Sequence, residues 1–104
     1  MDFEITEIIS EIKEDYKNSI KPLVEKGLYK LAGVKLANIN LAYIKPNINS
    51  LIAYSHFGLN FVGASLGLEE RLREKGDIEE LITFFEASLA QIELSQKTRE
   101  LFPE

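Results

Sequence analysis

His56 is the only histidine of this 104-residue chain, and it stands four residues before Asn60 in a stretch without charged residues. In a helix, side chains four residues apart lie on one face. The pair could form a polar site in which His56 acts as a general base or contacts a ligand, oriented by Asn60. The neighbouring helical positions provide no acidic partner, because they hold Ile52, Ala53, Leu59 and Asn60. We therefore favour a solvated or hydrogen-bonded face over catalysis.

Most other catalytic and metal-binding chemistry lacks the residues that it needs. The chain has no cysteine, which excludes disulfides, thiol catalysis and cysteine-ligated metals. A ferritin-like di-iron site needs Glu-x-x-His pairs, but Ala53 stands where the glutamate before His56 would be. Zinc sites lack ligands for the same reason, and there is no phosphate-binding glycine loop or nucleophile elbow. We expect no catalytic residue, metal or cofactor, and we favour a protein that is not an enzyme.

His56 and Asn60 belong to a longer stripe of small and polar residues whose spacing alternates between four and three. The members of this uncharged stripe are Asn49, Ala53, His56, Asn60, Gly63 and Gly67. Small residues let a second helix approach closely, because the distance between packed helices depends on the side chains at the contact. The uncharged stripe is therefore the candidate binding surface, with Tyr54 as a candidate pocket residue.

The stretch 46–68 that carries this stripe contains no charge, so a transmembrane helix has to be considered. Polar residues recur along it, namely Asn47, Asn49, Ser50, Ser55, His56, Asn60 and Ser65. Each would need a partner within hydrocarbon, and the mean hydropathy of the stretch is below that of a typical span. We expect a helix buried in a protein core rather than a membrane span.

Composition narrows the class of protein further. A net charge of -5 without a basic cluster argues against nucleic-acid binding, which needs concentrated lysine and arginine. A hydrophobic content of 45% is typical of a globular chain, and 104 residues are enough for one domain, residues 1–104. The first residues alternate acids with isoleucine and do not resemble a signal peptide. We expect a cytoplasmic protein.

Apolar residues that recur every three or four positions predict four helices. Their expected bounds are 3–19, 22–44, 47–75 and 77–101. The first and fourth have one apolar stripe each, whereas the second and third are apolar around most of their circumference. We expect an all-α, up-down four-helix bundle in which the second and third helices make the most contacts.

Two of these boundaries depend on proline and glycine. Proline inside a helix costs about 3 kcal/mol and glycine about 1 kcal/mol, so we place the first break at 18–21, before Pro22, rather than at Gly27. The alternative remains that the first helix ends at Gly27, after a Glu-Lys pair typical of a helix end. The third helix either continues through the segment from Gly63 to Gly67 or breaks there.

The segment 76–89, GDIEELITFFEASL, resembles the second half of a tetratricopeptide repeat. Leu81 and Ser88 depart from it, because that family prefers alanine at their positions, and Glu69 stands where a small residue is usual. The resemblance implies packed helical hairpins that bind peptides or proteins, with two such hairpins as the alternative fold. The segment 53–68 is similar to the last helix of short archaeal helical proteins of unknown function.

Three functions are left to compare. We favour a non-enzymatic interaction module that binds itself as a homodimer, or binds another protein, through the uncharged stripe. The alternative is a small-molecule site or enzyme in a bundle pocket around His56 and Asn60. Nucleic-acid binding is the third, and the acidic charge argues against it.

Overall fold

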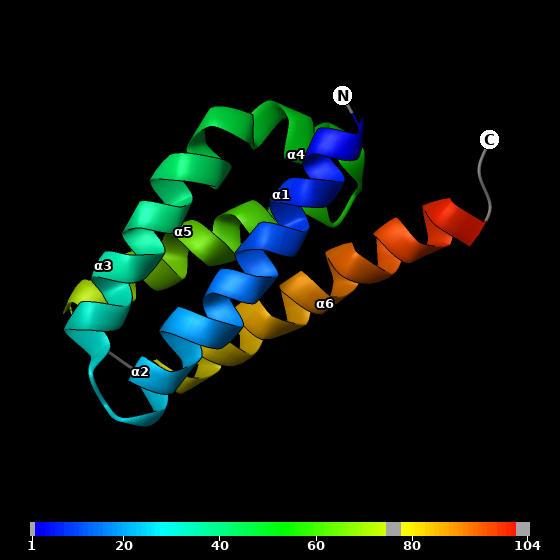
Figure 1. The fold of residues 1–104 in the computed structure, drawn as a ribbon. Helices are drawn as coiled ribbons and strands as arrows, with labels where there is room; N and C mark the ends of the chain where they lie inside the picture. The colour runs from blue at the N-terminus through cyan, green and yellow to red at the C-terminus, as the bar shows by residue number, and fades with distance from the viewer. Residues whose placement is uncertain (1, 75–77, 102–104) are drawn as a thin grey trace.

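The computed structural model describes residues 2–74 and 78–101, and this part of the chain is helical, without a strand. Four helical rods, 2–25, 29–54, 58–74 and 79–101, run alternately up and down (Figure 1). The prediction of an all-α four-helix bundle is confirmed. No helix of the described chain is long and apolar enough to cross a membrane.

The first rod continues past the predicted break before Pro22. It consists of α1 (Asp2–Asp15), the π turn η1 (Tyr16–Ile20) and α2 (Lys21–Glu25). In η1 the backbone N–H of Lys21 donates to the carbonyl of Tyr16, five residues back instead of four. A proline ring clashes with the carbonyl one α-helical turn before it, and the wider π turn makes room for that ring. The boundary at 18–21 is therefore wrong.

The second rod contains the same arrangement. It runs through α3 (Tyr29–Ile39), the π turn η2 (Asn40–Ile44), the 3-10 turn η3 (Lys45–Asn47) and α4 (Ile48–Tyr54). The N–H of Lys45 donates to the carbonyl of Asn40, again five residues back, and Pro46 follows. The rod bends between α3 and α4 (Figure 1). The predicted end of the second helix at 44 is therefore a bend inside a longer rod.

The turn between the first two rods lies at Gly27. Its backbone φ is +77°, in the left-handed region that favours glycine. Leu28 N–H donates to the carbonyl of Leu23 at 2.9 Å, and Gly27 N–H to that of Val24 at 3.0 Å. These two bonds form a Schellman motif, which satisfies the last carbonyls of a helix. Gly27, the alternative boundary, is the true end of the first helix.

The predicted third helix, 47–75, is two helices joined by a sharp turn at 55–57, and not at the segment from Gly63 to Gly67. Ser55 adopts extended dihedrals, and α5 (Gly58–Glu74) starts three residues later. A Cβ at Gly58 would lie 2.0 Å from the carbonyl oxygen of Leu51, so only glycine permits the close approach of α4 and α5. A contact between two separate turns of backbone thus decides where the helix breaks.

The last rod, α6 (Glu79–Leu101), packs along α5 and α1. The core draws on every rod: Ile5, Ile9, Ile12, Ile20, Leu36, Ile44, Leu51, Phe61, Leu68, Leu72, Phe85 and Ile92 are among its buried residues. Several apolar residues of the second rod are nonetheless exposed, among them Leu31, Val34 and Leu41, as described below. The predicted start of the fourth helix at 77 lies outside the described residues.

Three glycines should respond differently to the same substitution. Gly58→Ala should lower the free energy of unfolding by about 3 kcal/mol, since neither backbone can yield. Gly27→Ala should cost about 1 kcal/mol because of its positive φ. Gly63→Ala should stabilise by about 0.8 kcal/mol, because Gly63 is helical and no atom lies within 4 Å of its added Cβ. Urea denaturation of the three variants measures this order, and a Gly63→Ala loss equal to that of Gly58→Ala would contradict it.

Candidate functional site

The turn at 55–57 divides the uncharged stripe between two helices. Asn49 and Ala53 lie exposed on α4, whereas Asn60 and Gly63 lie exposed and Gly67 half-buried on α5. The open space above Gly63 and Gly67 would admit added side chains. The six residues therefore do not form one continuous helical face, and their role in binding stays a prediction.

His56 lies in the turn itself and is exposed. Its ring stacks on the neighbouring Phe57, with 3.9 Å between centroids. The expected relation to Asn60, one helical turn away on a continuous helix, does not hold, because α5 begins only at Gly58. Among the described residues no group of three histidines, cysteines or acids could hold a metal ion.

Tyr54 is buried rather than open to a pocket. The guanidinium of Arg99, from the far end of α6, lies 4.4 Å from the centre of the Tyr54 ring. The same guanidinium donates a hydrogen bond to the Tyr54 carbonyl. Next to it, the Ser95 hydroxyl donates to the Ser55 hydroxyl at 3.0 Å. The candidate pocket residue is thus part of the contact that holds α6 against the turn.

A buried polar network that the sequence did not predict joins η2 to α5. Asn40, fully buried, donates through Nδ2 to the Ser65 carbonyl at 3.1 Å and to Glu69 Oε1 at 2.8 Å. Its Oδ1 accepts a hydrogen bond from the Ser65 hydroxyl. All donors and acceptors of the amide are therefore used. A shift of η2 along α5 would break these bonds together, so the network sets the register of the two rods.

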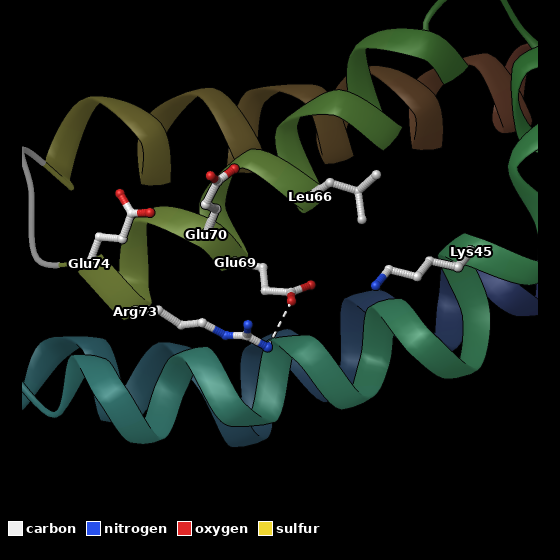
Figure 2. Close-up of a pocket in the computed structure, with 6 residues that line it drawn as sticks. All are labelled: Lys45, Leu66, Glu69, Glu70, Arg73 and Glu74. Atoms are coloured by element: carbon white, nitrogen blue, oxygen red, sulfur yellow. Dashed lines mark ion pairs between the residues drawn. The ribbon is translucent and has the colours of Figure 1, made fainter.

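The network reaches the surface through Glu69. Glu69 is 9% exposed, and its Oε2 pairs with Arg73 Nη2 at 3.1 Å, one turn along α5. A hollow of about 530 Å³ opens beside it, lined by Lys45, Leu66, Glu69, Glu70, Arg73 and Glu74. Figure 2 shows Lys45 and Arg73 approaching Glu69 from opposite sides, while Glu70 and Glu74 extend on the other side of α5.

One signal in the sequence could have indicated this network. Asn40 follows the buried Leu36 by four residues and precedes the buried Ile44 by four, so it interrupts an apolar face. A polar residue at such a position needs a buried partner. The identity of that partner could not be derived, because Ser65 and Glu69 belong to another rod.

A second polar contact stands at the other π turn. The Tyr16 hydroxyl donates to Glu86 Oε2 of α6 at 2.6 Å, and Lys21 Nζ lies 3.9 Å from the same oxygen. Burial and, secondly, the hydrogen bond to Glu86 raise the pKa of Tyr16 above its usual value. Each π turn therefore begins with a buried polar residue that hydrogen-bonds a carboxylate on another rod.

The outward face of the second rod is apolar. Leu31, Val34 and Leu41 are 47%, 54% and 65% exposed. With the exposed Asn38 they are spaced by three, four and three residues, so they follow one side of the rod. We call Leu31, Val34, Asn38 and Leu41 the α3 strip. We expected the second helix to be among those with the most contacts, but on this side its apolar residues are exposed.

Removal of the buried amide should be costly. In Asn40→Ala, the Ser65 hydroxyl and Glu69 Oε1 lose their partner inside the protein, so the free energy of unfolding should fall by about 3 kcal/mol. The exposed Asn38 is the matched control, and Asn38→Ala should change it by no more than about 0.5 kcal/mol. Urea denaturation measures both, and equal effects of the two substitutions would contradict the role of the network.

The raised pKa of Tyr16 predicts a dependence of stability on alkaline pH. The unfolded chain releases the phenolic proton near pH 10, before the folded chain does, so stability is full below about pH 10 and falls by up to about 1.4 kcal/mol per pH unit above it. Tyr16→Phe should lose this component of the slope, whereas Tyr29→Phe, at an exposed tyrosine, should keep it. Urea denaturation across this pH range decides, and a Tyr16→Phe slope equal to that of the unaltered chain would count against it.

Comparison with protein-family models, with curated proteins and with solved structures finds no match to this chain. The resemblance of 76–89 to a tetratricopeptide repeat therefore stays a prediction. Within it, 79–89 belong to the single helix α6, which packs antiparallel to α5 as in any up-down bundle.

Proposed function

We propose that this chain is a non-enzymatic helical interaction module that binds another polypeptide through the α3 strip. The supporting observation is the distribution of exposed large apolar side chains. Of the ten in the described chain, three lie together on the α3 strip, namely Leu31, Val34 and Leu41. A concentration of exposed apolar surface is typical of a protein interaction site.

The spacing of the strip favours a helical partner. Residues that alternate three and four apart form the seam by which one helix packs lengthwise against another. The small Ala37 and Ala42 lie beside Asn38 and Leu41 in the sequence and would let a partner helix come close. The partner is either a second copy of the chain or a different protein.

Two other proposals have less support. The small-molecule or catalytic site around His56 would have to form at an exposed turn, beside a Tyr54 that Arg99 covers. Self-association through the uncharged stripe would use the exposed Asn60 and Gly63 of α5, without the half of the stripe on α4. We also propose a cytoplasmic location, which fractionation of the source cells would test.

A photocrosslinking amino acid at Val34 tests the proposal directly. In cells, it should form a protein adduct, and the added mass tells whether the partner is a second copy or another chain. The same group at Leu94, an equally exposed apolar position on α6, is the matched control and should form none. The absence of an adduct from Val34, or equal adducts from both positions, would refute the proposal.

The substitutions Val34→Ser and Leu41→Ser provide the complementary evidence. Because both side chains are exposed, the double variant should change the free energy of unfolding by only about 0.5 kcal/mol. Capture of the crosslinked partner should nevertheless fall at least about tenfold, as expected when apolar residues central to an interface are truncated. Unchanged capture by a folded double variant would place the interface elsewhere.

A further inference from the structure

Charge is divided unequally along the chain. From Lys26 to Leu68 there is no aspartate or glutamate, and the charged residues of this stretch are Lys26, Lys30, Lys35 and Lys45. The remaining chain holds all 17 acids and the other 8 of the 12 basic residues, so it carries 8 − 17 = −9 against +4 for the middle stretch. The α3 strip therefore lies on the basic part of an acidic protein.

The charges around the strip are mostly positive. Lys30 and Lys35 are exposed next to Leu31 and Val34, and Lys45 is exposed one turn beyond Leu41. No carboxylate of the described residues forms an ion pair with any of these three lysines.

At one end of the strip, the acids Glu69, Glu70 and Glu74 of α5 line the hollow together with Lys45 and Arg73, whereas Lys30 and Lys35 do not line it. Glu69 is buried and already pairs with Arg73, whose guanidinium lies on the side of α5 that faces α3. Glu70 and Glu74 extend from the opposite side of α5 (Figure 2). A partner that approaches along the strip therefore meets the ammonium groups of Lys30 and Lys35 at its borders, and charges of both signs around the hollow at Lys45.

We propose that the partner of the α3 strip is an acidic amphipathic helix, with apolar residues spaced by three and four and with Asp or Glu beside them. This inference rests on the proposed function and adds the chemistry of the partner. The apolar residues would pack between Leu31, Val34 and Leu41, and the carboxylates would pair with Lys30 and Lys35.

A second copy of this chain fits the strip less well. Pairing of two α3 strips would place lysines opposite lysines, with no acid between Lys26 and Leu68 to compensate. The glutamates of α1 would complement the lysines, but the apolar side of α1 is already buried in its own core, through Ile5, Ile9 and Ile12. Charge complementarity therefore favours a different protein.

The test uses the full chain and two synthetic helical peptides of about 18 residues, five turns. One carries leucines at three- and four-residue spacing with glutamates beside them, and its twin has lysine in place of each glutamate. Backbone NMR shifts locate the binding site and give the affinity. We expect the acidic peptide to shift amides of α3 and η2 and to bind at least about tenfold more tightly than its twin, with affinity that falls as salt rises.

Charge reversal on the chain identifies the groups responsible. Lys30→Glu with Lys35→Glu should abolish the preference for the acidic peptide or invert it. Lys17→Glu with Lys97→Glu, at exposed lysines of η1 and α6, is the matched control with the same net charge and should retain the preference. A preference lost equally in both double variants would show only an effect of net charge and would overturn the proposal.

Other results would overturn the inference in distinguishable ways. Equal affinity of both peptides for the strip would leave the proposed function standing and refute the acidic partner. Shifts of the strip by vesicles of phosphatidylserine, without shifts by the acidic peptide, would identify a membrane surface instead. Concentration-dependent broadening confined to the strip in the free protein would identify a second copy. If the amide signals of the strip neither shift nor broaden in any of these measurements, and Val34 forms no crosslink, the proposed function itself is refuted.

Discussion

Proline has no backbone N–H, and the way the chain accommodates two prolines inside helices shapes the whole bundle. Pro22 and Pro46 each follow the dipeptide Ile-Lys, and each is preceded by a π turn whose hydrogen bond spans five residues. The wider turn leaves room for the proline ring, so helical structure continues past it. The first two rods reach 25 and 54 for this reason. If each of these rods ended before its proline, the bundle would be shorter.

The π turns also decide what the rods present to one another. Tyr16 and Asn40 each open a π turn and are buried, and each hydrogen-bonds a carboxylate from a rod distant in sequence. An apolar core is tolerant of small sliding between helices, whereas a buried amide that uses all its hydrogen-bonding groups is not. The polar contacts therefore complement the core: apolar burial holds the rods together, and the hydrogen bonds set their register.

The surface follows from the same geometry. With Asn40 and Ile44 directed into the bundle, Leu41 points outward and extends the side on which Leu31 and Val34 lie. This side borders no other rod, and it occupies the stretch of chain that has no acid. Exposed apolar groups stand beside lysines that form no ion pair with the described carboxylates, which suits a partner that covers the apolar groups and neutralises the lysines. The turn at 55–57 contains no lysine, which is why the proposed interface moves from the uncharged stripe to the second rod.

Helical periodicity alone determined the class of fold and the buried faces of the outer rods. The stripe from Ile5 to Ile20 and the one from Phe85 to Ile92 are buried as predicted, since each helix has one apolar side and therefore one possible orientation. The second rod is apolar on more than one side, so its pattern could not tell which side meets a neighbour. The sequence also did not decide between the possible breaks, although Gly27 was one of the alternatives. Local propensity placed one before Pro22, but a π turn removed it, and the turn before Gly58 depends on a carbonyl of Leu51 seven residues away. Only the tertiary structure brings such groups together, and the same holds for Asn40 and Glu69. The distance in space between two residues far apart in the chain depends on the whole fold and cannot be derived from either residue alone.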